Sequence, residues 1–124
     1  MLENRAAVIT IKDDPYQQYF WPAICLQWNG GLDSVGPVLA VCKELVNIYG
    51  DSPRDAILVL ENVLYKWRAI GGRSIYGSFN AGDYHNGVYI IDKGFNIIGR
   101  EFMYRAEEDL YDFNELKAEI MSKL

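Results

Sequence analysis

Arginine, aromatic and amide side chains crowd into residues 68–105, and together they could bind a phosphorylated, nucleotide-like ligand. Arginine holds phosphate in a bidentate manner, and aromatic rings stack on bases and sugars. The arginines are Arg68, Arg73, Arg100 and Arg105, and the neighbouring aromatic residues include Tyr76, Phe79, Tyr84, Phe102 and Tyr104. This mixture of residue types favours recognition of a ligand.

Eight residues form the predicted ligand-binding set. We expect Arg100 and Arg105 to contact phosphate, an aromatic side chain to stack on a base, and Asn86 or Asp83 to contact ribose or a base edge. The complete set is Trp21, Arg73, Phe79, Asp83, Asn86, Arg100, Phe102 and Arg105.

The same side chains also have an ordinary structural interpretation. Arg100 or Arg105 could pair with nearby glutamates, which are Glu101, Glu107 and Glu108. Aromatic residues in sheets commonly pack in the core or across strands. A second aromatic group at residues 16–21 could form a pocket wall or a subunit interface, of which the interface is favoured. The sequence leaves these alternatives open.

Residues that would indicate catalysis are missing. His85 is the only histidine, which excludes a two-histidine metal site, and no phosphate-binding glycine motif occurs. The acidic run at residues 107–109 is typical of a solvated face rather than of a cation site. A catalytic pair of Asp83 and His85 would predict turnover that disappears in His85→Ala. We expect instead a non-enzymatic protein without metal or cofactor.

Composition narrows the class of partner. The net charge of −5 gives no favourable field for duplex nucleic acid, whose binding depends on phosphate neutralisation.

Cys25 and Cys42 lack the spacing of a zinc site and are expected to be reduced core thiols. No apolar run is long enough to span a membrane and no signal pattern opens the chain, so we expect a cytoplasmic protein that forms a single domain over residues 1–124.

Strand patterns would place the candidate residues on a sheet. β-Branched residues predict a strand at 6–11, alternation predicts a second at 24–28, and a short third is expected at 74–79. The clearest hairpin pattern runs from 88–92 through a two-residue turn, Lys93-Gly94, into a long strand at 95–104.

A pair of helices separates the second strand from the third. The first is expected to be capped by Asp33 or Ser34, with Pro37 in its first turn. The second should run from Ser52, its N-cap, to the stop signal at Gly71. Their short connection predicts a helical hairpin.

A last helix should begin near Asp112, with Glu115 as the capping-box partner. Its apolar stripe is expected to comprise Leu116, Ile120 and Leu124. The element order is then β-β-α-α-β-β-β-α, which predicts an α+β fold with a mainly antiparallel sheet and the helical hairpin packed on one face.

In size, acidity and element order, and in the residues Phe79, Asn86, Arg100, Phe102 and Arg105, the chain resembles the phage-encoded Thoeris anti-defence proteins of the first type. The resemblance implies a homo-oligomer that sequesters cyclic ADP-ribose isomers made by TIR-domain enzymes, and in some members cyclic oligonucleotides, without cleaving them. A phage-encoded protein of this kind would act in the host cytoplasm against host defence signalling. The alternative is an acidic protein-interaction module, of the inhibitor or immunity type, that occludes a basic partner through residues 16–21 and 107–112.

Overall fold

The computed structural model describes residues 7–11, 22–26, 30–49, 53–68, 74–76, 86–101 and 110–124. Their elements are, in chain order, β1 (Ala7–Ile11), β2 (Pro22–Leu26), α1 (Leu32–Tyr49), α2 (Pro53–Arg68), β3 (Ser74–Tyr76), β4 (Val88–Ile91), β5 (Ile97–Glu101) and α3 (Phe113–Ser122). This order is the predicted β-β-α-α-β-β-β-α, and the α+β class is confirmed.

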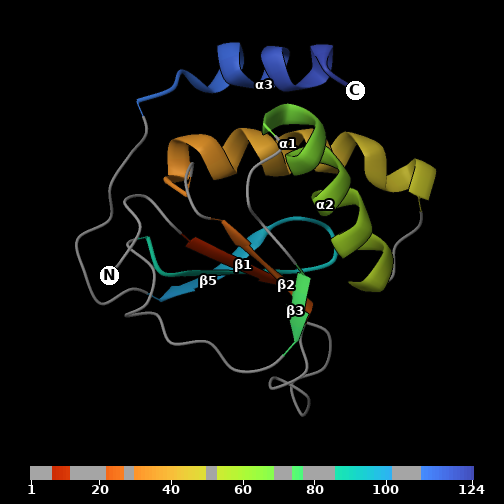
Figure 1. Ribbon diagram of the computed structural model, residues 1–124, viewed down its shortest axis with the longest axis vertical. Coiled ribbons are helices and arrows are strands. Elements are labelled where there is room, and N and C mark those ends of the chain that lie inside the picture. Colours follow the sequence, from red (N-terminus) through yellow and green to blue (C-terminus); the bar gives the residue numbers. More distant parts are fainter. Residues whose placement is uncertain are drawn as a thin grey trace.

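The described strands form one five-stranded sheet in the order β3-β2-β1-β4-β5 (Figure 1). Neighbouring strands are antiparallel except for the central pair, in which β1 and β4 run parallel. A parallel pair requires a long crossover, and here the chain between β1 and β4 contains β2, both helices of the hairpin and β3. The sheet is therefore mixed, with mainly antiparallel pairing as predicted.

Alternation along the central strands separates two faces of the sheet. Ile9 and Ile11 of β1 belong to the main hydrophobic core, which also contains residues of all three helices. Val8 belongs to a smaller cluster on the opposite face, together with Ala23 and Val88. Successive side chains of a strand point to opposite faces, which explains why the fully buried strand β1 supplies both clusters.

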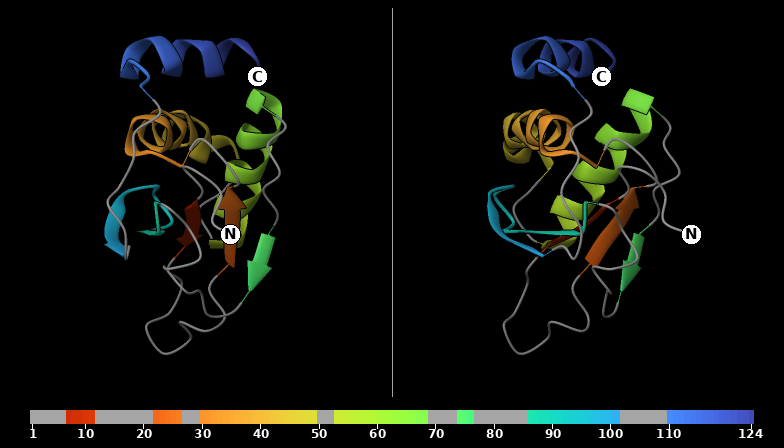
Figure 2. Two further views of the ribbon diagram at one scale, coloured as in Figure 1. Left: turned by 60° about the vertical axis from the view of Figure 1, so that its left-hand side comes forward. Right: turned by 90° about the vertical axis from the view of Figure 1, so that its left-hand side faces the viewer.

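All three helices lie on one side of the sheet (Figures 1 and 2). α1 and α2 pack against each other, and α2 also packs on β1 and β2, so the predicted helical hairpin covers one face. α3 packs against α1 on the side away from the sheet (Figure 2). None of the helices in the described segments is both long and apolar enough to cross a bilayer.

The start of α1 differs from the prediction. The helix begins at Leu32, and the carbonyl of Gly31 accepts its first hydrogen bond at 2.9 Å, so the cap lies upstream of Asp33 and Ser34. Pro37 consequently lies inside the helix rather than in its first turn. Asp33 instead accepts a hydrogen bond from the backbone N–H of Tyr111 at 2.6 Å, a contact between segments far apart in sequence.

The β4–β5 connection is longer than the predicted two-residue turn and spans residues 92–96. The carboxylate of Asp92 accepts hydrogen bonds from the backbone N–H groups of Gly94 and Asn96, each at 2.9 Å. Phe95 adopts a positive φ of 65° and buries its side chain in the core. This side-chain-stabilised loop replaces the tight turn, and it delays the start of the second strand from residue 95 to residue 97.

The second strand begins at Pro22, before its predicted start at residue 24. α2 begins at Pro53, while its expected cap, Ser52, lies outside the described residues. The expected strand at 74–79 is described only as β3, and Trp28 at the end of the second strand also lies outside the described residues.

α3 confirms the predicted cap and most of the predicted stripe. The Asp112 carboxylate accepts a hydrogen bond from the backbone N–H of Glu115 at 3.0 Å, and Leu116 and Ile120 are buried. Leu124 was expected to extend this stripe but is exposed, because the helix ends before it.

Candidate functional site

Two of the eight predicted ligand-binding residues, Asn86 and Arg100, lie in the described segments, and they are in contact. The Nη2 atom of Arg100 donates to Oδ1 of Asn86 at 3.3 Å and lies 3.4 Å from its backbone carbonyl. The other predicted residues lie outside the described segments: Trp21, Arg73, Phe79, Asp83, Phe102 and Arg105.

Strand register explains how Asn86 and Arg100 meet. The antiparallel pairing of β4 and β5 places Arg100 opposite Tyr89 and Glu101 opposite Val88. Asn86 lies two residues before β4 and is therefore at the same end of the strand pair as Arg100. Gly87 links Asn86 to the strand with a positive φ of 69°, which glycine adopts without steric cost.

The aromatic ring of Tyr89 packs against the guanidinium group of Arg100. The guanidinium carbon of Arg100 lies 4.2 Å from the centroid of the Tyr89 ring, within the range of a cation–π interaction. The fully buried Tyr89 donates its hydroxyl proton to the carbonyl of Gly30 at 2.6 Å. We call Asn86, Tyr89 and Arg100 the arginine cluster.

Gly30 connects the arginine cluster to the helical layer, because it lies two residues before α1. The sequence interpretation did not include Tyr89 or Gly30 in the site. The sequence pattern did place Tyr89 in the predicted strand at 88–92, and this strand pairs across the hairpin with the strand that carries Arg100. The longer loop shifts that pairing, so the partner of Arg100 could not be identified without the correct register.

The described contacts of Arg100 are with a side-chain amide, a backbone carbonyl and an aromatic ring. The guanidinium rests on an amide and an aromatic ring, and Glu101, next to it on the strand, is opposite Val88 on the other face of the sheet. Glu107 and Glu108 lie outside the described residues. The side chain of Arg100 is partly exposed, whereas Asn86 is fully buried. The Asn86 amide and the Tyr89 ring thus hold the guanidinium group of Arg100 from two sides.

A separate groove of about 320 Å³ lies between α1, the start of α3 and the β4–β5 loop. It is lined by Gly36, Leu39, Ala40, Lys43, Phe95, Asn96, Ile97 and Phe113. The ring of Phe113 lies 3.4 Å from the position that a Cβ on Gly36 would occupy, so the two residues pack in van der Waals range at the wall of the groove. The groove is mainly apolar, and Lys43 contributes its one charged group.

Neither the arginine cluster nor the groove has the side chains of a metal centre. Within the described segments, no group of three or more His, Cys, Asp or Glu side chains could hold a metal ion. The single histidine, His85, lies outside those segments, as does the acidic run at 107–109. No protein-family model, no curated protein and no solved structure matches the chain. A functional assignment therefore depends on the chemistry of the arginine cluster and of the groove.

Proposed function

We propose that this protein is a non-enzymatic binding protein that sequesters a phosphorylated, nucleotide-derived signal at the arginine cluster. The class of ligand is a cyclic ADP-ribose isomer or a cyclic oligonucleotide, as the resemblance to Thoeris anti-defence proteins implies. Sequestration of such a signal would counteract host defence signalling.

The observation that carries the proposal is the fixed position of the Arg100 guanidinium. A flexible arginine loses conformational entropy when it binds phosphate, and this cost falls when the side chain is already held in place. The Tyr89 ring and the Asn86 amide hold Arg100 in this way while leaving it partly exposed. The positive charge of the guanidinium then attracts a phosphate despite the net charge of the chain.

The arrangement also suits binding without turnover. Arginine stays protonated at all physiological pH values, so Arg100 can stabilise an anion but cannot act as an acid or base. We therefore expect Arg100 to hold phosphate, with Arg105 and Arg73 as further cations and with Phe79, Phe102 or Trp21 stacking on the base. Asn86 orients Arg100, and Asp83 contacts ribose.

Calorimetry against cyclic ADP-ribose isomers and cyclic di- and trinucleotides tests the proposal. We expect one of these ligands to bind wild type, and Arg100→Lys to weaken binding by about tenfold or more, because an ammonium group cannot reproduce the bidentate, ring-stacked geometry. Lys66→Ala is the matched control, since it removes an exposed positive charge from α2. Absence of heat with every ligand, or equal losses in both variants, would contradict the proposal.

A second candidate function is a protein-interaction module, and the groove favours it. Phe113 and Ile97 line the groove and are 48% and 39% exposed, and the nearby Leu110 is 86% exposed. Exposed apolar side chains around a hollow are typical of a surface that receives a partner's side chain. Charge reversal at Glu107, Glu108 and Asp109 should slow association with a basic partner and leave nucleotide binding almost unchanged.

A further inference from the structure

The groove beside the β4–β5 loop has the size of a small-molecule site. Its volume is about 320 Å³, and it lies between α1, the start of α3 and the loop. Small-molecule sites in proteins span roughly 300–1,000 Å³, and an apolar cavity of about 150 Å³ holds one benzene ring. The groove therefore has room for a molecule of about two rings.

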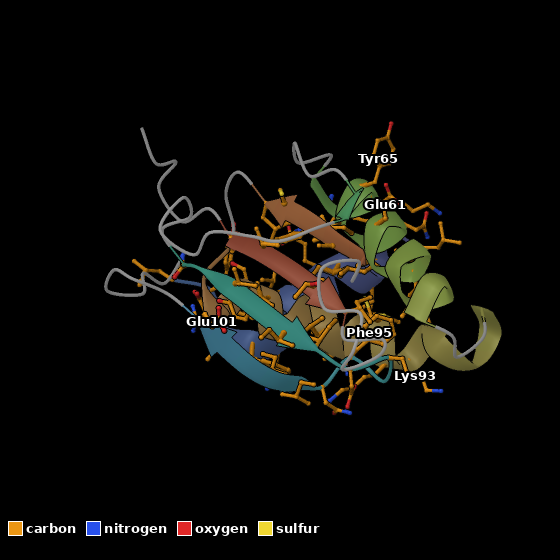
Figure 3. The ribbon with its side chains drawn as sticks, turned by 90° about the horizontal axis from the view of Figure 1, so that it is seen from below. Glu61, Tyr65, Lys93, Phe95 and Glu101 are labelled. Atoms are coloured by element: carbon orange, nitrogen blue, oxygen red, sulfur yellow. The ribbon has the colours of Figure 1, made fainter. Side chains whose placement is uncertain are left out.

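The floor of the groove is apolar and its rim is open to solvent. Leu39 and Phe95 are 3% and 1% exposed, whereas Ile97 and Phe113 are exposed at the rim. Figure 3 shows Phe95 pointing from the loop into the molecule, while Lys93 of the same loop points outward. An apolar molecule in this groove would remove both its own surface and the exposed lining from water, which favours binding.

The walls of the groove are held in place by contacts within the chain. On the loop side, Asn96 donates its backbone N–H to the Asp92 carboxylate at 2.9 Å and its side-chain amide at 3.2 Å. On the helical side, the Phe113 ring packs in van der Waals range of Gly36. A hollow whose walls are already ordered reduces the entropy that binding would cost.

Lys43 of α1 is the one charged residue among those that line the groove. Its neighbour Glu44 pairs with Lys117 of α3 at 2.7 Å, whereas Lys43 forms no ion pair in the described part of the chain. The carboxylate of the nearby Asp92 is bonded to N–H groups of the loop rather than to Lys43. An available cation beside an apolar hollow is complementary to an anion with an apolar body.

We infer that the groove binds a small organic anion with an apolar body of one or two rings, such as an aryl carboxylate. The rings pack on Leu39, Phe95 and Phe113, and the carboxylate lies beside the ammonium group of Lys43. A protein partner that inserts one apolar side chain would not need this charge, whereas a small anion does. The site lies at the loop end of the β4–β5 hairpin and the arginine cluster at the other end, so the inference does not rest on nucleotide binding.

The first experiment titrates the full chain with 2-naphthoate and with 2-naphthamide, which has a similar shape and no charge, and follows the amide NMR signals. We expect 2-naphthoate to bind with a dissociation constant of about 1 mM or below, and 2-naphthamide about three- to tenfold more weakly. Lys43→Gln should weaken binding of 2-naphthoate by the same factor and leave 2-naphthamide unchanged. Lys66→Gln is the matched control, because it removes an exposed positive charge from α2.

The second experiment fills the groove. Ala40 lines it from α1, and Ala40→Leu should weaken binding of both compounds by about tenfold or more, because the larger side chain takes the space of the rings. Ala118→Leu makes the same change at an exposed position of α3 outside the lining and should have no effect. Leucine is a good helix former, and far-UV circular dichroism establishes that both variants are folded.

Absence of binding at about ten times the expected dissociation constant overturns the inference. So do equal affinities for the two compounds, and so does binding of 2-naphthoate that Lys43→Gln or Ala40→Leu leaves unchanged. Weaker binding at higher protein concentration would also overturn it, since a second copy of the chain would then occupy the groove.

Arg100→Lys separates this inference from the nucleotide proposal. This variant should weaken nucleotide binding and leave 2-naphthoate binding unchanged, because Arg100 does not line the groove. Loss of 2-naphthoate binding in Arg100→Lys would place the anion at the arginine cluster and overturn the inference.

Discussion

Burial decides what individual polar and reactive side chains of this protein can do. Arg100 is partly exposed, and its guanidinium group rests on the Tyr89 ring. Cys42 is fully buried in the core between α1 and the sheet. Burial raises the pKa of the Cys42 thiol far above its ordinary value, more than a backbone hydrogen bond lowers it. Since the thiolate is the reactive form, Cys42 should be inert.

We therefore predict that Cys42 is not modified by a thiol reagent in the folded protein and is modified promptly in urea. The measurement uses Cys25→Ser, in which Cys42 is the only thiol, and follows release of thionitrobenzoate from Ellman's reagent. Wild type should differ only by the contribution of Cys25, which is partly buried. Labelling of Cys42 at the same rate with and without urea would contradict the burial described above.

Among the elements, the β4–β5 loop is organised by one carboxylate. Asp92 accepts hydrogen bonds from Gly94 and from the backbone and side chain of Asn96. Burial alone would raise the pKa of Asp92, but these donors and the nearby positive charge of Lys43 outweigh it, so the pKa lies below its ordinary value of 3.8. The ionised form is therefore favoured in the folded state, and it stabilises the loop that sets the register of Arg100.

Asp92→Asn should lower the free energy of unfolding at neutral pH by about 1 kcal/mol, a modest figure because Asp92 is only partly buried. A carboxylate whose folded pKa is depressed stabilises above its unfolded pKa and loses this effect as pH falls through the folded pKa. The difference between wild type and variant should thus shrink below about pH 4. Urea titrations at several pH values measure it, with Lys93→Gln as the control in the same loop. A difference that stays constant down to low pH would contradict the assigned role of the charge.

On the scale of the whole molecule, the helices form two successive layers over one face of the sheet. α1 lies between the sheet and α3, and Leu116 and Ile120 of α3 join the same core as Ile9 and Tyr89 of the sheet. The segment just before α3 also reaches α2, through an edge-to-face contact between Tyr111 and Trp67, whose ring centroids are 6.2 Å apart. We therefore expect α3 to unfold together with the rest of the protein.

Leu116→Ala should destabilise the protein by about 2–4 kcal/mol, because it opens a cavity between α3 and α1. The urea midpoints from circular dichroism and from tryptophan fluorescence should fall together. Met121→Ala, at a position 38% exposed on the same helix, should change the free energy of unfolding by about 0.5 kcal/mol or less. Loss of α3 signal before the fluorescence change would show that α3 is an independent unit.

Local patterns in the sequence sufficed for features that depend on near neighbours. The element order, the start of α2 at Pro53 and the Asp112 cap all follow from caps, turn residues and periodicity within a few positions. Errors arose where a distant or unexpected partner intervened. The Asp92 carboxylate lengthened the predicted turn, and α1 began before Asp33, which instead binds Tyr111.

The sequence by itself determined which segments become strands and helices, and it marked Asn86 and Arg100 as candidate ligand contacts. Only the tertiary structure decided that β1 and β4 are parallel neighbours, that Arg100 rests on Tyr89, and that β5 is last in the order of the described strands. The physical reason is the separation in sequence over which each kind of interaction acts. Helix caps and strand alternation act over a few residues, whereas strand order and register depend on pairing between segments that are separated by as much as most of the chain.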